Sequence, residues 1–186
     1  MPTEWFNDEL VNGYVELLRA RQLKFASSVR PKPHYIFFSS FFYDCLVKKN
    51  RYKYDSVKRW TRNEMVLKAR GIFIPVNIRN SHWLLVVVQP AAGRVELFDS
   101  LGHGSVSVGD HIARWAKQEA AARGLRNKNW SVVQMHCRRQ ENSDDCGVFT
   151  CRHMELLSKG ETVVNWGGRL SYHRRRIAAE LLASSF

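Results

Sequence analysis

A polar loop that leads directly into a helix constrains this chain more than any other feature. Residues 140–147 read Gln-Glu-Asn-Ser-Asp-Asp-Cys-Gly, and apolar residues at helical spacing follow them. Cys146 therefore opens a helix, with Ser143 and Asp145 as candidate caps of its first turn. The free backbone N–H groups and the positive dipole end of a helix start favour a thiolate. Cys146 is a candidate nucleophile, although a cysteine at a helix start is more often a small packed residue.

The helix that follows reads as amphipathic. Its apolar face carries Phe149, His153 and Met154, and Gly160 is placed to end its last turn. The opposite face carries the charged residues Arg152, Glu155 and Lys159.

A predicted hairpin supplies a base for this nucleophile. Residues 82–89 and 94–98 read as two strands joined by a Pro-Ala-Ala-Gly turn. Folding about that turn places Asp99 near Leu84 and diagonally close to His82, and such diagonal neighbours lie about 7–8 Å apart at Cα. Asp99 can then fix the tautomer of His82 and leave the other ring nitrogen to take the proton of Cys146.

Gln140 completes this set of groups, because an attacking thiolate creates an oxyanion that a side-chain amide and the Cys146 backbone N–H can stabilise together. Each residue also has a plain structural explanation. His82 can be a strand-end histidine, Asp99 a turn former and Gln140 a solvated loop residue. The combination of nucleophile, base, orienting carboxylate and oxyanion donor favours covalent catalysis by a thiol.

The wider pattern predicts a single domain over residues 1–186, of the α+β class. With 45% apolar residues, the chain is long enough to bury one sizeable core. Helices are expected to flank a central mixed β-sheet, with a cleft between the Cys146 helix and the hairpin. The expected strands are 71–78, 82–89, 94–98 and 130–137, and the other expected helices are 8–19, 110–123 (capped by Asp110 and closed by Gly124) and 170–182.

Nearly from end to end, the chain resembles the ubiquitin-like-protein-specific proteases of the sentrin-specific type, cysteine peptidases that act on SUMO precursors and conjugates. The resemblance implies a papain-like cysteine protease variant with the catalytic order His-Asp-Cys, and the 17 positions from His82 to Asp99 agree with that family. The blocks that carry it are Trp5-Phe6-Asn7-Asp8, Phe41-Phe42-Tyr43, Val57-Lys58-Arg59-Trp60-Thr61, Ser81-His82-Trp83, Phe98-Asp99-Ser100-Leu101-Gly102, Gln140-x-Asn142-x-x-Asp145-Cys146-Gly147 and Tyr172-His173-Arg174-Arg175-Arg176.

The resemblance implies the same catalytic roles as the residue chemistry does. Its implied catalytic residues are Cys146 as nucleophile, His82 as general base and acid, Asp99 as orienter and Gln140 as oxyanion donor. It adds that Trp5 and Trp83 roof a narrow tunnel, in which only the Gly-Gly end of a modifier fits between the two indole rings.

Three further positions match residues that contact the body of the modifier in relatives. They are Asp8, Arg59 and Trp60. Each has an alternative explanation: Asp8 can act in the first turn of a helix, Arg59 can be a solvated charge and Trp60 can be ordinary packing.

The charge balance, 29 Lys and Arg against 17 Asp and Glu, predicts an electropositive surface that attracts acidic partners. An acidic modifier accounts for it as well as nucleic acid does, so nucleic acid is not required. No apolar stretch is long enough for membrane insertion. We expect an intracellular protein, nuclear or cytoplasmic, that acts as a monomer. Because Trp5 opens the family pattern almost at the first residue, a targeting or regulatory region is expected outside this sequence.

No cofactor and no metal are expected. The four cysteines do not form a cysteine-dense framework, so free thiols are expected. A zinc site is conceivable but lacks the usual Cys-x-x-Cys pairs. Its candidate ligands are His136, Cys137, Cys146, Cys151 and His153.

The expected function is therefore a cysteine protease and isopeptidase that cleaves after the C-terminal Gly-Gly of SUMO. It would process precursors and release the modifier from lysine. A deubiquitinase or deneddylase on the same scaffold is the main alternative. An acetyltransferase with the same triad and a modifier-binding scaffold without turnover are further ones.

Overall fold

A five-stranded mixed sheet forms the centre of the molecule in this computed structural model, which describes residues 4–26, 34–62, 65–102, 105–126 and 128–183. The strand order is β1-β4-β5-β6-β7. Its outer pairs, β1 with β4 and β6 with β7, are parallel, and the inner pairs are antiparallel. The α+β class and the mixed sheet are confirmed. The strands are β1 (Tyr35–Phe37), β4 (Gly71–Ile78), β5 (His82–Gln89), β6 (Arg94–Phe98) and β7 (Ser131–Gln134).

The predicted hairpin forms from β5 and β6, with Leu85 opposite Phe98. Two details of the sheet differ from the sequence pattern. Strand β1, only three residues long, was not predicted. Strand β7 ends at Gln134 rather than at Cys137, because its partner β6 has five residues and the pairing stops where Leu97 meets Gln134.

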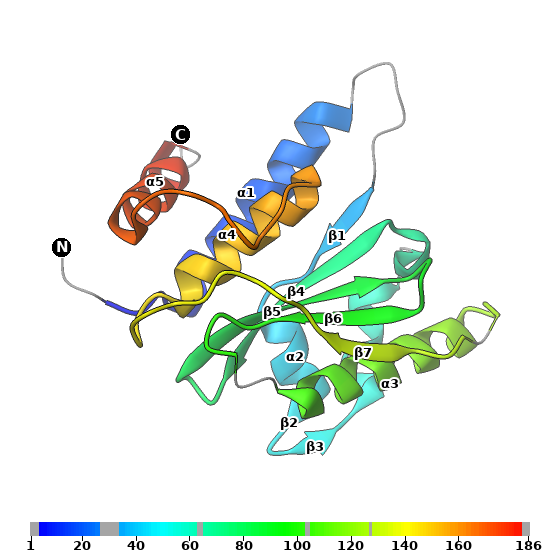
Figure 1. Cartoon of the computed structure of the whole chain (residues 1–186). Helices are drawn as coiled ribbons and strands as arrows, with labels where there is room; N and C mark the ends of the chain where they lie inside the picture. The colour runs from blue at the N-terminus through cyan, green and yellow to red at the C-terminus, as the bar shows by residue number, and fades with distance from the viewer. Residues whose placement is uncertain (1–3, 27–33, 63–64, 103–104, 127, 184–186) are drawn as a thin grey trace.

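Helices cover both faces of the sheet (Figure 1). One face carries α1 (Asp8–Ala26), α4 (Cys146–Lys159) and α5 (Leu170–Ala183). The other carries α2 (Phe41–Leu46) and α3 (Val106–Ala122). The remaining short elements are the ribbon of β2 (Val47–Lys48) and β3 (Arg51–Tyr52) and the 3-10 turns η1 (Tyr54–Ser56), η2 (Lys58–Thr61) and η3 (Val66–Lys68).

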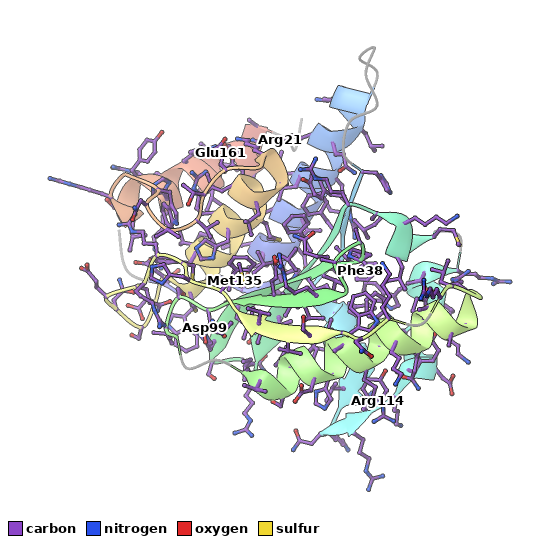
Figure 2. All side chains as sticks on the ribbon, turned by 45° about the vertical axis from the view of Figure 1, so that its right-hand side comes forward. Arg21, Phe38, Asp99, Arg114, Met135 and Glu161 are labelled. Atoms are coloured by element: carbon purple, nitrogen blue, oxygen red, sulfur yellow. The ribbon has the colours of Figure 1, made fainter. Side chains whose placement is uncertain are left out.

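Strand β5 divides its side chains between two apolar clusters, one on each face of the sheet. Leu85 and Val87 pack under α1 and α4, whereas Leu84 and Val86 pack toward α2 and α3. Because both faces are covered, the strand is a continuous apolar run instead of an alternating one. Figure 2 shows side chains filling the space between the sheet and each helical layer.

Two predicted helix boundaries need correction. Helix α1 continues to Ala26 instead of ending at 19. Helix α3 begins at Val106, so Asp110 lies inside it and does not cap it. The earlier start follows from burial, since Val108 is only 3% exposed and belongs to the core. The predicted end of α3 holds, because Gly124 takes the left-handed conformation at φ +63°.

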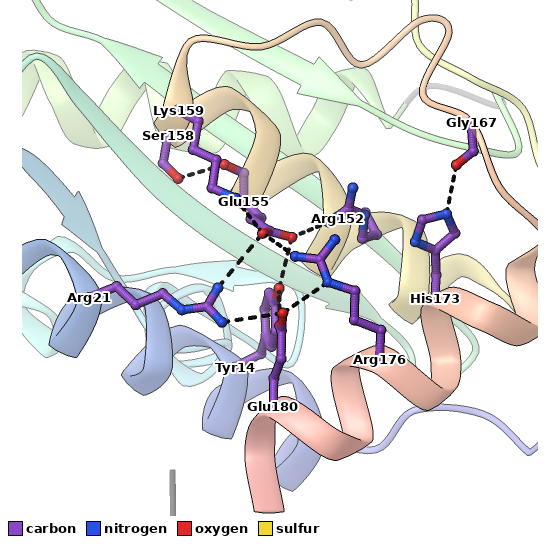
Figure 3. A network of polar contacts seen from close by, with 10 residues as sticks. All are labelled: Tyr14, Arg21, Arg152, Glu155, Ser158, Lys159, Gly167, His173, Arg176 and Glu180. Atoms are coloured by element: carbon purple, nitrogen blue, oxygen red, sulfur yellow. Dashed lines mark hydrogen bonds and ion pairs between the residues drawn. The ribbon is translucent and has the colours of Figure 1, made fainter. Parts of the chain in front are cut away.

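Helix α4 ends as predicted, with Gly160 at φ +78°, but its predicted charged face is wrong. Glu155 is fully buried and Arg152 is 6% exposed. The reason is that α4 is sandwiched between β5 and the helices α1 and α5, so it has no broad solvent face. Its buried charges are paired instead, as Figure 3 shows. Across the described residues, none of the helices has the length and apolar character needed to cross a bilayer.

Candidate active site

The candidate catalytic residues meet where three elements end. His82 is the first residue of β5, Asp99 directly follows β6, and Cys146 is the first residue of α4. The hairpin register brings the first two together, with His82 Nε2 2.8 Å from Asp99 Oδ1. The predicted contact between these side chains is therefore present. The same ring nitrogen cannot also serve Cys146.

Asp99 is held as an anion. Its side chain is 2% exposed, and the backbone N–H of Leu101 donates to Asp99 Oδ1 at 2.9 Å. Burial alone would raise the pKa of this carboxyl, but His82 and the N–H groups of Leu101 and Gly102 lower it. The charged form is therefore the one that faces His82.

His82 keeps one ring nitrogen open. Its Nδ1 is buried and makes no hydrogen bond with any described residue. Burial alone would lower the pKa of the imidazole, yet its interactions with Asp99 and with Cys146 raise that pKa to about 9. Because Nε2 is taken by Asp99, Nδ1 is the atom left for the Cys146 proton.

Cys146 lies at the start of α4 and is 1% exposed. A Cβ on the next residue, Gly147, would lie 2.5 Å from Phe6 Cβ and 3.4 Å from Trp83 Cδ1. Glycine at this position therefore lets the N-terminal segment and β5 press against the helix start. The nucleophile candidate sits at the contact of all three segments.

The two predicted caps of α4 are not observed. Asp145 occupies the N-cap position without a side-chain cap bond, because its carboxylate accepts from Asn142 Nδ2 at 2.7 Å and from Arg174 Nε at 2.5 Å. The Ser143 hydroxyl donates to Asp144 Oδ1 at 2.9 Å instead. The first-turn N–H groups of α4 therefore receive no side-chain oxygen from either residue.

Gln140 is fixed by Ser100, the residue that follows Asp99. The Ser100 hydroxyl donates to Gln140 Oε1 at 2.5 Å, and the Gln140 backbone N–H donates to the Ser100 carbonyl at 3.1 Å. Gln140 Nε2 donates to the carbonyl of Asn142 at 2.6 Å. One short loop, 99–100, thus positions both the candidate orienting carboxylate and the candidate oxyanion donor. In the sequence, Ser100 was named only as part of the block Phe98-Asp99-Ser100-Leu101-Gly102 that carries the family resemblance.

A cavity of about 330 Å³ opens beside His82 and joins the two tryptophans that the sequence singled out. Trp5 is 45% exposed, and its indole N–H donates to Asp144 Oδ1 at 3.0 Å. Trp83 is 2% exposed, and its indole N–H donates to the Phe6 carbonyl at 2.7 Å. The lining side chains include Trp5, Asp8, Asn77, Asn80, His82 and Trp83.

Residues 4–180 match the Ulp1 protease family, C-terminal catalytic domain. This chain belongs to that family. A sentrin-specific protease of Caenorhabditis elegans is 30% identical over 183 residues, covering 96% of this chain and 25% of the relative. Sentrin-specific protease 3 of Mus musculus is 33% identical over 158 residues, covering 82% of this chain and 26% of the relative. The chain thus spans about a quarter of the length of these two relatives.

Solved structures of the Ulp1 family share the fold. The Chaetomium thermophilum Ulp1-like SUMO protease catalytic domain superposes with a TM-score of 0.81 at 27% identity. The match covers 98% of this chain and 74% of that one.

Of the three positions predicted to contact the body of the modifier, Asp8 lines the cavity beside His82, whereas Arg59 and Trp60 lie in η2. Asp8 lines the cavity and accepts from the Ser40 hydroxyl at 3.1 Å, while Asn7 caps α1 through the N–H of Leu10. Arg59 is exposed in η2. Trp60 packs edge-on against Phe38 and Phe42 and does not line the cavity beside His82.

Phe41 is an exposed aromatic residue that sequence reasoning did not select. It is 50% exposed, whereas Phe42 next to it is fully buried. A signal was available in the sequence, because adjacent side chains of an α-helix point about 100° apart, so a helix with one buried face favours only one of the two in the core.

The four cysteines are all free thiols. Burial raises the pKa of Cys137 to about 11, and burial together with Glu155 raises that of Cys151 well above the ordinary range. Neither thiol therefore resembles an activated nucleophile. Within the described ranges, no three His, Cys, Asp or Glu side chains gather in a way that would hold a metal ion.

Proposed function

We propose that this domain is a thiol protease and isopeptidase that cleaves after the C-terminal Gly-Gly of SUMO, from precursors and from lysine conjugates. The observation that carries the proposal is the His82 and Asp99 pair. The remaining imidazole nitrogen makes no hydrogen bond with a described residue, and the imidazole interacts with Cys146 at a helix start. A thiol, a base and an orienting carboxylate in this relation are the minimum equipment for covalent acyl transfer.

In the proposed reaction, Cys146 attacks the carbonyl of the terminal glycine after its proton passes to His82 Nδ1. His82 then returns that proton to the departing lysine amine or peptide tail, and later activates the water that hydrolyses the thioester. Asp99 acts through His82, because its charge stabilises the imidazolium and its hydrogen bond fixes the ring.

Gln140 is the proposed side-chain donor to the oxyanion, together with the backbone N–H of Cys146. Ser100 holds the Gln140 carbonyl oxygen at 2.5 Å, which fixes which end of the amide carries the N–H groups. One of the two amide hydrogens reaches the Asn142 carbonyl, so the second is the one available to the reacting carbonyl.

The proposed substrate class follows from the cavity and from the relatives. A cavity lined by Trp5 and Trp83 beside the proposed catalytic base is proposed to take a tail without side chains. The relatives are named as sentrin-specific and SUMO proteases. Asp8, Arg59 and Trp60 are proposed to contact the body of the modifier. A net charge of +12 favours encounter with an acidic modifier. We place the protein inside the cell, in the nucleus or the cytoplasm, where such conjugates occur.

The test is cleavage of a SUMO precursor and of a SUMO–lysine conjugate, with ubiquitin and the neddylation modifier run in parallel. We expect turnover of the SUMO substrates by the native sequence and none by Cys146→Ala. Turnover of ubiquitin or the neddylation modifier alone would keep the chemistry and replace the substrate. Cleavage of no substrate would overturn the proposed function.

A further inference from the structure

A single guanidinium ties the C-terminal helix to two segments beside the candidate active site. Arg174 lies in the first turns of α5, and each of its three nitrogens has its own acceptor. Nε donates to Asp145 Oδ1 at 2.5 Å, Nη1 to the Glu4 carbonyl at 2.6 Å and Nη2 to the Asp144 carbonyl at 2.7 Å. The planar fork of arginine suits such simultaneous bonding, which a lysine ammonium cannot reproduce.

The three acceptors all adjoin groups of the candidate site. Glu4 directly precedes Trp5, and Asp144 is the residue whose carboxylate accepts the Trp5 indole N–H at 3.0 Å. Asp145 directly precedes Cys146. Arg174 therefore fixes the backbone next to Trp5 through Glu4. It also fixes Asp144, which binds the Trp5 indole, and Asp145, which precedes Cys146.

The N-terminal segment depends on such contacts, because residues 4–6 belong to no helix or strand. Besides Arg174, the segment is held by the Trp83 indole, which donates to the Phe6 carbonyl. The guanidinium also lies over the Phe6 ring, 5.3 Å from its centroid. With the side chains of Arg174 and Asp145 only 16% and 5% exposed, this ion pair is shielded from solvent and more persistent than a surface pair.

We propose that Arg174 is a positioning residue. Its three hydrogen bonds form a clamp, which holds Trp5 over the cavity beside His82 and connects Trp5 to the loop that precedes Cys146. The inference rests on the proposed function, since it gives Trp5 a role in binding the modifier tail. Arg174 acts through Trp5 and Asp145 and touches no reacting atom. Its loss should weaken capture of the extended tail more than the intrinsic reactivity of the Cys146 thiol.

The kinetic experiment compares Arg174→Met with Arg175→Met. The neighbouring Arg175 is exposed and has no hydrogen bond or ion pair with a described residue, so its variant removes the same charge without the clamp. For a fluorogenic SUMO substrate we expect Arg174→Met to raise KM about tenfold or more, since small misplacements of a binding group are costly. Arg175→Met should stay within about twofold of the native sequence, and Arg174→Lys should recover only part of the loss.

A double-mutant cycle with Trp5→Ala separates the clamp from general destabilisation. If Arg174 works through Trp5, Arg174→Met should cost much less in the Trp5→Ala background than in the native one. Alkylation of Cys146 by iodoacetamide should proceed at nearly the native rate in Arg174→Met. Additive losses in the cycle, or equal losses in Arg174→Met and Arg175→Met, would overturn the proposal.

A measurement without substrate keeps this inference separate from the proposed function. The indole N–H resonance of Trp5, assigned through Trp5→Phe, should move in Arg174→Met and stay in place in Arg175→Met. An unmoved resonance in both variants would contradict the clamp even if SUMO is cleaved. A moved resonance in Arg174→Met, in a protein that cleaves no modifier, would keep the clamp and discard the substrate.

Discussion

Helix α4 carries a polar cluster at each end, and the two clusters differ in whether their buried polar atoms have partners among the described residues. At the C-terminal end, the Glu155 carboxylate is fully buried and accepts from the Tyr14 hydroxyl at 3.0 Å, from Lys159 at 2.6 Å and from Arg176 at 2.6 Å (Figure 3). Arg152 pairs with it as well. At the N-terminal end, the imidazole beside Cys146 keeps a buried nitrogen without a partner in the described structure.

This difference separates a cluster that stabilises the fold from one that is equipped for chemistry. Burial alone would raise the pKa of Glu155, but the hydrogen bond of Lys159 and the charges of Arg152 and Arg176 lower it to about 2. The carboxylate accepts from Tyr14, Arg152, Lys159 and Arg176, and it joins α4 to α1 and α5. The His82 nitrogen that makes no hydrogen bond with a described residue is instead left for proton exchange with Cys146.

The largest expected effect is at the catalytic end. Cys146→Ala should reduce turnover by at least about 10⁴-fold, because no other group can form the thioester. Modifier binding should persist, and the free energy of unfolding should change by about 1 kcal/mol or less, as is usual for so small a change. Single-turnover kinetics and chemical denaturation measure the two quantities. Near-native turnover would exclude Cys146 as the nucleophile.

At the other end of the helix, Glu155→Gln should destabilise the fold by about 3–5 kcal/mol, since it leaves the buried Arg152 and the half-buried Arg176 without the Glu155 charge. Turnover per folded molecule should stay near the native value. Glu161→Gln is the matched control, because Glu161 is exposed just beyond the same helix. A stable Glu155→Gln protein would mean that the network contributes little to folding.

Gln140→Ala tests the oxyanion donor within the catalytic cluster. Loss of one such donor lowers kcat by about 10²–10³-fold, because the transition state loses a preorganised hydrogen bond. The exposed neighbour supplies the control, since Glu141→Gln changes the charge of the same loop and should alter kcat by much less. Equal kinetics for Gln140→Ala and the native sequence would remove Gln140 from the mechanism.

The smallest expected effect is a pH dependence of opposite sign at the two clusters. The pKa of His82 is raised from 6.5 to about 9, so its contribution to stability is complete below pH 6.5 and is lost as the pH rises through 9. The pKa of Glu155 is lowered from 4.5 to about 2, so its contribution is present above pH 4.5 and is lost as the pH falls through 2.

Denaturant unfolding across this pH range can assign each change to its residue. The alkaline loss of stability should disappear in His82→Gln, and the acid loss should shrink in Glu155→Gln. Profiles that both variants leave unchanged would contradict the assigned charge states.

The catalytic cluster was more predictable from sequence than the buried network, for a physical reason. His82 and Asp99 lie on one hairpin, so the turn fixes their register and their meeting follows from local geometry. Contact of Cys146 with that pair is long-range, and it was inferred from complementary chemistry and from the family resemblance.

Two features of the structure were missed in the sequence, the burial of Glu155 and the bonds of Arg174, because both depend on contacts between residues that are distant in sequence. The charged side of α4 was read as opposite to the core, yet Glu155 is buried because Tyr14 and Arg176, distant in sequence, come to meet it. Arg174 was likewise named only within the Tyr172–Arg176 block of the family resemblance, since its partners Glu4 and Asp145 lie 170 and 29 positions away. A one-dimensional pattern assigns a charge to a face and does not reveal which partner will cover it.

The most direct test of the account is covalent capture by mature SUMO carrying a C-terminal electrophile, followed by intact-mass analysis and peptide mapping. Cys137 and Cys151, whose pKa values are raised by burial, provide internal controls. We predict one adduct, on Cys146, that is absent from Cys146→Ala. An adduct on another cysteine would contradict the claim that the N-terminal end of α4 is the catalytic centre. The absence of any adduct on the folded protein, with SUMO, ubiquitin and neddylation-modifier probes alike, would contradict it as well.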